Sequence, residues 1–184
     1  MKVTHIAGSP RVNGNSARIA AAFCRAAEEK GAEVTSYILN TMRIKGCQGC
    51  LACKRDHEKC VVKDDLTPVF EEFYTTDILV FSTPIYVGDV TGQLKCCFDR
   101  MYSLAAPNLA ASRLPKGKKL VFIQTQGADA SSHKDVAERY LGVFKFFFED
   151  TSLIRACSLL GEEDVEKQPW ILSEAEALAN RLVV

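Results

Sequence analysis

The sequence lacks an excess of charge of either sign and lacks any long apolar run. Its 23 basic and 23 acidic residues give a formal net charge of zero. This balance argues against nucleic-acid binding and against attachment to an anionic membrane surface, since both depend on surplus Lys and Arg. No apolar run approaches the roughly 18 residues needed to span a bilayer. Residues 1–10 carry no apolar segment or cleavage site of a secretion signal, so we expect a cytoplasmic protein.

Several common catalytic and nucleotide-binding motifs are also missing. The sequence contains no His-Glu-x-x-His, no Ser-His-Asp ordering and no evident acid–base pair. The dinucleotide fingerprint Gly-x-Gly-x-x-Gly is absent. The sequence does not match a P-loop either, because five residues rather than four separate Gly8 from Gly14, and Asn15 follows in place of Lys. These absences are compatible with an enzyme whose cofactor supplies the reactive chemistry.

Cysteine, by contrast, is abundant, with eight residues in 184. A chain of this length buries enough apolar surface to fold without disulfide bonds. In a reducing compartment these cysteines indicate metal or redox chemistry. Four are scattered through apolar stretches, where a thiol behaves as a small hydrophobic group: Cys24, Cys96, Cys97 and Cys157. The other four share one segment, 46–61.

Strand-like and helix-like segments alternate along the chain, without an internal repeat or linker. Strands are expected at 2–7, 33–39, 77–82, 118–125 and 152–160, and helices at 16–30, 65–75, 93–104, 131–148 and 173–182. This alternation predicts a single α/β domain over 1–184, a doubly wound, three-layer, five-stranded parallel sheet of flavodoxin type with strand order 2-1-3-4-5. Ligands of such sheets bind beyond the carboxyl ends of the strands.

The loop after the first strand has the composition of a phosphate site. Backbone N–H groups at a helix N-terminus suit an anion, and Ser and Asn side chains add donors. We expect a single phosphate monoester, such as that of FMN, to be bound by Ser9, Arg11, Asn13, Asn15 and Ser16. The alternative is an ordinary turn in which Ser16 caps the helix.

Three motifs in order resemble the NAD(P)H-dependent FMN reductases. They are Gly-Ser-Pro-Arg…Gly-Asn-Ser at 8–16, Thr-Pro-Ile-Tyr at 83–86, and Gly-Gln-Leu-Lys…Phe-Asp-Arg-Met-Tyr at 92–102. The resemblance implies that the isoalloxazine ring of FMN lies along Pro84, Ile85, Tyr86, Val87 and Gly88. It also implies that Thr125, Gln126 and Gly127 reach the other side of the ring. Backbone groups for the pyrimidine edge and apolar contact for the face are what a flavin requires.

The clustered cysteines are spaced as Cys47-x-x-Cys50-x-x-Cys53-x6-Cys60. Three thiolates at successive three-residue steps and a more distant fourth resemble a 4Fe-4S motif, whereas zinc sites usually use two separated pairs. Within a flavodoxin-like chain this arrangement resembles the iron–sulfur flavoprotein family. That resemblance implies that Cys47, Cys50, Cys53 and Cys60 are the cluster ligands. Zinc, free thiols or a redox disulfide remain alternatives.

Together these resemblances imply an FMN-dependent oxidoreductase with a 4Fe-4S cluster. Electrons would come from a ferredoxin-like donor or NAD(P)H and pass to a small acceptor such as dioxygen, peroxide or a quinone. The alternatives are a cluster-free NAD(P)H-dependent FMN reductase and, from another class, an electron carrier or zinc-stabilised interaction module. The dense Phe144–Phe148 segment predicts a contact with a second subunit in a homodimer or homotetramer, or else a thicker core.

Two isolated residues are interpreted structurally. His5 lies in an apolar strand and is expected to be a core histidine rather than a metal ligand. Asp99 and Arg100 are expected to form a pair on a helix surface that holds a loop.

Overall fold

Strands and helices alternate along the whole chain. The computed structural model describes residues 1–184. The parallel strands are β1 (Lys2–Ala7), β2 (Glu33–Ile38), β3 (Ile78–Tyr86), β5 (Lys119–Thr125) and β6 (Asp150–Ala156). The α-helices are α1 (Asn15–Glu29), α2 (Leu66–Glu72), α3 (Gly92–Arg100), α4 (Lys134–Phe144) and α5 (Pro169–Leu182). Short 3₁₀ turns are η1 (Leu39–Thr41), η2 (Ala52–Lys54), η3 (Met101–Leu104) and η4 (Asp164–Lys167).

The sheet has the order β2-β1-β3-β5-β6, and all of these neighbours are parallel. A further two-residue strand, β4 (Asp89–Val90), pairs antiparallel with the end of β3. Because β4 only folds back on β3, the five parallel strands follow the order 2-1-3-4-5. The predicted flavodoxin-like sheet is therefore confirmed.

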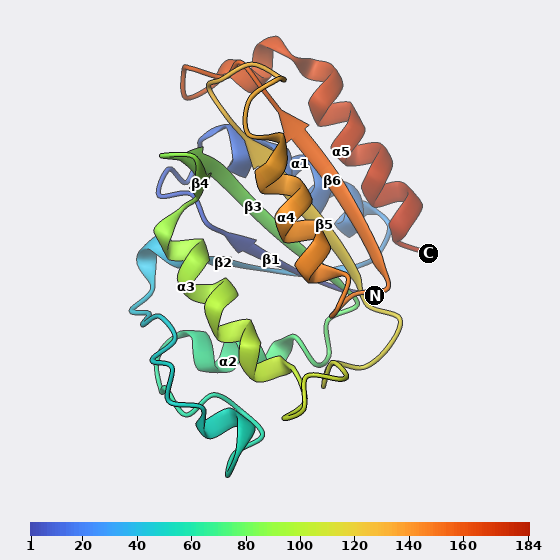
Figure 1. Cartoon of the computed structure of the whole chain (residues 1–184). Coiled ribbons are helices and arrows are strands. Elements are labelled where there is room, and N and C mark those ends of the chain that lie inside the picture. Colours follow the sequence, from blue (N-terminus) through green and yellow to red (C-terminus); the bar gives the residue numbers. More distant parts are fainter.

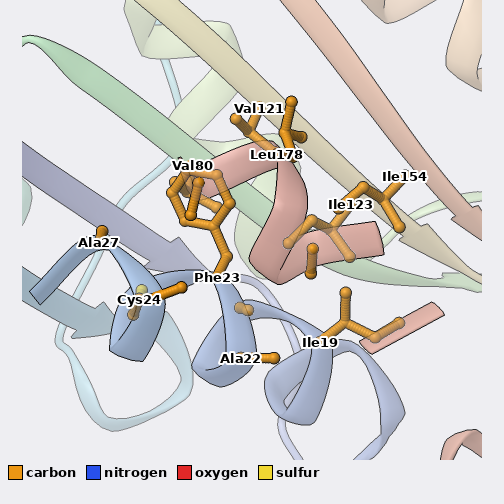
Figure 2. Close-up of a cluster of buried hydrophobic side chains, with 14 of the residues drawn as sticks. Ile19, Ala22, Phe23, Cys24, Ala27, Val80, Val121, Ile123, Ile154 and Leu178 are labelled. Atoms are coloured by element: carbon orange, nitrogen blue, oxygen red, sulfur yellow. The ribbon is translucent and has the colours of Figure 1, made fainter. Parts of the chain in front are cut away.

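Helices cover both faces of the sheet (Figure 1). On one face α1 and α5 pack against the strands; Figure 2 shows Phe23 and Ile19 of α1 beside Val80, Ile123 and other apolar side chains of this cluster. On the other face α2, α3 and α4 enclose a second buried cluster. Burial on both faces explains why the inner strands read as nearly continuous apolar runs. No helix is long and apolar enough to cross a membrane.

Strand β3 extends beyond residue 82, where the predicted strand ends. Pro84 lies within the strand, opposite Thr125 of β5. The chain instead turns at Val87 and Gly88, which have φ angles of 49° and 80°. Two successive positive φ angles are what a tight hairpin between antiparallel strands requires. The hairpin carries Tyr86 and Val87 beyond the edge of the parallel sheet.

Three other elements also have boundaries that differ from the predicted ones. The helix expected at 131–148 is shorter, because His133 has a φ of 55° and the helix ends at Phe144. Phe144 and Phe148 are 1% and 4% exposed, whereas Phe146 is 39% exposed. A thicker core thus accounts for Phe144 and Phe148, whereas the ring of Phe146 is exposed on the surface. The last strand ends at Ala156 rather than residue 160, and the last helix begins earlier, at Pro169.

His5 is a core residue, as predicted. Its ring nitrogens form hydrogen bonds with Ser36 (3.3 Å) and Ser82 (2.8 Å), which joins the three strands β2, β1 and β3. The side chain is buried, and burial lowers the pKa of His5 from 6.5 to about 4. Between pH 6.5 and about 4, the unfolded chain therefore binds a proton at His5 that the folded protein does not bind.

We expect this difference to destabilise the protein by about 3 kcal/mol as the pH falls from 6.5 to about 4. His5→Gln should remove this part of the pH dependence, because glutamine does not titrate. The measurement is the free energy of urea unfolding at several pH values in this interval. His57→Gln is the matched control, since His57 is exposed and should keep the wild-type slope. Equal slopes for wild type and His5→Gln would contradict the assignment.

Candidate functional site

The loop between β1 and α1 is held close to the start of α3. The Gly8 amide donates to the Ser82 carbonyl (2.8 Å), and the Gly8 carbonyl accepts from the Thr91 hydroxyl (2.7 Å). A Cβ atom at Gly8 would lie 2.8 Å from Cβ of Leu94, closer than two such atoms can approach. Glycine therefore allows the loop to approach α3 and sets the position of the residues that follow it.

A cavity of about 210 Å³ lies at the carboxyl ends of the strands, where the predicted loops meet. Ten of the predicted residues line it: Ser9, Arg11, Asn15, Ser16, Pro84, Ile85, Tyr86, Thr125, Gln126 and Gly127. Asn13, Val87 and Gly88 were also predicted to bind the cofactor, but they do not line this cavity. Three segments distant in sequence thus form one concave site, as expected for a doubly wound sheet.

The side chains of the first loop differ in their availability. Ser16 is 2% exposed and lines the cavity without a hydrogen bond from its hydroxyl to the protein. The Asn15 amide donates to the Gly161 carbonyl (2.8 Å), and its oxygen accepts from the Val165 N–H (2.9 Å). The Asn15 side chain therefore joins the start of α1 to residues 161–165, and it also lines the cavity.

Sequence reasoning missed one wall of the cavity. Leu159, Leu160 and Glu162, from the loop between β6 and α5, also line it. The Glu162 carboxylate forms an ion pair with the Arg11 guanidinium, with 3.3 Å between Oε1 and Nε. This loop follows the carboxyl end of a parallel strand. The strand-end rule, by which ligands bind beyond the carboxyl ends of the strands, would have included this loop had the predicted strand ended at Ala156.

Gln126 supports the third loop through its side chain. Its oxygen accepts from the Gln124 amide (2.8 Å), and its nitrogen donates to the carbonyls of Asp129 (2.7 Å) and Ser132 (2.9 Å). Arg155 donates to the Ala130 carbonyl (2.9 Å) and also contacts the Ser132 carbonyl. These bonds shape the loop at the cavity, so Gln126 positions the backbone there rather than extending its amide into the site.

The cysteine segment forms a long loop that is closed at its base by two carboxylates. In Figure 1 it lies at the periphery, beyond α2 and the end of α3. Asp64 accepts from the Lys45 N–H (2.8 Å), and Asp65 accepts from the Arg43 N–H (2.7 Å). The two ends of the loop are therefore joined immediately before and after the cysteines.

All four clustered cysteines line one cavity of about 210 Å³: Cys47, Cys50, Cys53 and Cys60. Burial raises the pKa of Cys53; Lys54 opposes this, and the other three thiols raise the pKa further. Cys53 is thus close enough to feel the charge of each of the others. None of the remaining four cysteines lines the cavity.

Cationic side chains hold this loop in place by donating to backbone carbonyls. Arg55 donates to Cys50 O (3.0 Å), and Arg113 donates to Cys53 O (3.2 Å). Lys54 donates to the carbonyls of Tyr102 and Ala105 (2.6 Å each) and lies 4.2 Å from the Tyr102 ring centre. These bonds tie the cysteine loop to itself and to residues 102–113.

No three His, Cys, Asp or Glu side chains lie close enough together to hold a single metal ion. The four cysteines nevertheless line one cavity.

Arg100 is not the surface residue that the sequence predicts. Asp99 pairs with Lys95 on the exposed side of α3, whereas the Arg100 side chain is fully buried and pairs with Asp64. The partner lies 36 residues away in the chain. Arg100 also lines the cysteine cavity.

Comparisons with known proteins point to flavoproteins. Residues 1–145 match the sequence model of the NADPH-dependent FMN reductase family. An iron-sulfur flavoprotein of Methanosarcina thermophila is 36% identical over 110 residues, which are 60% of this chain and 57% of that protein. One of Methanocaldococcus jannaschii is 34% identical over 144 residues, 78% of this chain and 70% of that protein. This chain spans about half the length of several other curated relatives.

Solved structures share the fold at low sequence identity. An FMN-dependent NADH-azoreductase of Bacillus anthracis, in complex with FMN, superposes with a TM-score of 0.76 at 18% identity, covering 100% of both chains. An NAD(P)H:quinone oxidoreductase of Methanothermobacter marburgensis gives 0.77 at 17% identity, covering 99% of this chain and 96% of that one. At these identities the likeness concerns the fold.

Proposed function

Because the chain belongs to the NADPH-dependent FMN reductase family, we propose that it is an FMN-dependent NAD(P)H oxidoreductase that also uses a 4Fe-4S cluster. One observation carries the second half of the proposal. The four cysteines of the compact motif line a single cavity, and no other cysteine does. The names of the iron-sulfur flavoprotein relatives support the same assignment.

The FMN site in this proposal is the cavity at the carboxyl ends of the strands. Backbone N–H groups at the start of α1, with Ser9, Ser16 and Arg11, would hold the phosphate. Pro84–Tyr86 and Thr125–Gly127 would contact the ring from two sides. Bound FMN supplies hydride and electron transfer, so the protein needs no covalent nucleophile.

The Arg11–Glu162 pair indicates how the phosphate is admitted. Both residues line the cavity, and their side chains are 54% and 68% exposed. An exposed pair of this kind contributes little to stability. Arg11 can therefore exchange the Glu162 carboxylate for the phosphate at small cost, and it gains a more strongly charged partner.

The cysteine cavity fits a 4Fe-4S cluster by its donor set. Thiolates are the usual ligands of such clusters. Arg100 in the cavity wall is buried and has one guanidinium nitrogen without a partner. A buried cationic donor suits a cavity that holds an anionic, sulfur-rich group. A cluster bound there would exchange electrons one at a time.

Helix α3 connects the two proposed sites. Its start lies beside Gly8, through Thr91 and Leu94, and its last residue, Arg100, lies in the wall of the cysteine cavity. Nine helical residues rise about 14 Å. The two sites are thus at opposite ends of one rigid element.

The donor and acceptor are proposed from the relatives. NAD(P)H is the donor that the family name and the quinone oxidoreductase suggest, and a ferredoxin-like protein is the alternative for a chain with a cluster. The acceptor is proposed to be a quinone, dioxygen or peroxide. We also propose a homodimer or homotetramer, with Phe146 as the exposed ring available for contact.

Anaerobic purification followed by analysis of flavin, iron and acid-labile sulfide tests this function. We expect one FMN and about four iron atoms per chain, because that is the content of a 4Fe-4S flavoprotein. If the protein contains FMN but no iron and oxidises NAD(P)H, it is a cluster-free reductase. A colourless protein that binds zinc would contradict both halves of the proposal.

A further inference from the structure

Arg100 is a buried cation whose terminal nitrogens are used to close the cysteine loop. Its Nη1 donates to both oxygens of Asp64 (2.7 and 2.6 Å) and to the Lys45 carbonyl (3.3 Å). Its Nη2 donates to the Val62 carbonyl (3.1 Å). These bonds connect the end of α3 to the residues just before and just after the four cysteines.

The third nitrogen, Nε, is buried and has no partner in the protein. An unpaired buried donor costs about 1–3 kcal/mol, and more when it is charged, so proteins rarely keep one without reason. Arg100 lines the cavity that contains all four clustered cysteines. A second, smaller cavity of about 30 Å³ is also lined by Arg100, and Cys60 is the one cysteine of the four that lines both cavities with it. Cys60 is therefore the sulfur that we pair with the guanidinium.

The charge of Arg100 is largely balanced by Asp64. Burial would raise the pKa of Asp64, but hydrogen bonds from Arg100 and from the Lys45 N–H hold it below its ordinary value. Asp64 thus stays ionised at neutral pH. The pair presents a hydrogen-bond donor to the cavity with little net charge.

We propose that Arg100 sets the reduction potential of the cysteine-bound cluster by donating a hydrogen bond from Nε to the sulfur of Cys60. The inference rests on the proposed 4Fe-4S cluster. Hydrogen bonds to cluster sulfurs favour the more negative, reduced form and so raise the potential. Arg100 is accordingly a tuning residue, in addition to its part in closing the loop.

Arg100→Lys is the direct test. Lysine keeps the positive charge opposite Asp64 but has no nitrogen at the Nε position. We expect the anaerobic variant to retain wild-type iron and sulfide. In an electrochemical titration followed by electron paramagnetic resonance, the equilibrium constant for reducing the cluster should fall about tenfold. That factor is 59 mV for a one-electron couple.

Two further variants separate an effect on the reduction potential of the cluster from an effect on the stability of the fold. Asp64→Asn keeps Nε but removes the balancing charge, so its potential should rise rather than fall. Arg113→Lys is the matched control, because Arg113 supports Cys53 O and Ser103 O but does not line the cavity. It should lower the melting temperature without moving the potential. If Arg100→Lys loses iron, its reduction potential cannot be measured. The redox titration of Asp64→Asn then tests the proposal.

The outcomes are distinct. A full iron content with an unchanged potential in Arg100→Lys overturns the role of Arg100, as does an equal shift in Arg113→Lys. If Asp64→Asn is the deciding variant, a potential that does not rise overturns the role. Wild-type protein without iron overturns the proposed cluster itself. The wild-type analysis therefore precedes the variants.

Discussion

A Cys53→Ala protein is expected to lose its iron while it retains FMN. Cys53 lines the cavity together with the other three clustered cysteines, so its replacement removes one of the four proposed ligands. No other cysteine lines this cavity. The proposed flavin cavity is lined by different residues and should be unaffected. Iron per chain should fall at least about fivefold, measured with flavin content on the same anaerobic samples.

Cys157→Ser provides the matched control for this loss. Cys157 is also a partly buried thiol, but it lies after β6 and does not line the cysteine cavity. Its iron content should equal that of the wild type. Cys96 requires separate attention because its sulfur lies 3.7 Å from where a Cβ of Gly46 would be. The double variant Cys53→Ala/Cys96→Ser removes this possible substitute ligand. Wild-type iron in the double variant would refute the ligand assignment.

The sequence was sufficient to predict the sheet because local pattern and tertiary burial agree there. Apolar runs such as 78–81 are buried on both faces, so they could only be inner strands of a covered parallel sheet. The strand-end rule then brought the loops after β1, β3 and β5 to one cavity. Neither inference needed knowledge of a specific side-chain contact.

The errors occurred where long-range contacts decide. Nothing near Arg100 in the sequence shows that its partner is Asp64 rather than Asp99, because that choice is made when the cysteine loop folds against α3. The bond from the Asn15 amide to the Gly161 carbonyl could not be foreseen either, because it joins residues 146 positions apart in the sequence. Apolar residues near Leu159 extended the predicted strand, while Ser158, with a φ of 60°, turns the chain toward the proposed flavin cavity.

Ser16→Asp should weaken FMN binding about 1000-fold and leave riboflavin binding nearly unchanged. Ser16 is the second residue of α1 and lies in the wall of the proposed phosphate site. A carboxylate there would face the phosphate, and two unit charges about 4 Å apart at an effective dielectric of 20 repel by about 4 kcal/mol. Riboflavin has no phosphate and escapes this repulsion. Quenching of flavin fluorescence on titration gives both dissociation constants.

The substitution also discriminates between a binding defect and a folding defect. The helix N-terminus favours an acidic residue, which offsets the cost of placing a charge at this buried position, so the melting temperature should change little. Ser16→Ala is the control: it removes one charge-assisted hydrogen bond and should weaken FMN binding by about tenfold. If Ser16→Asp weakened FMN and riboflavin equally, the ring site would be disturbed rather than the phosphate repelled. If neither dissociation constant changed, the phosphate would lie elsewhere, and the start of α1 would serve the fold alone.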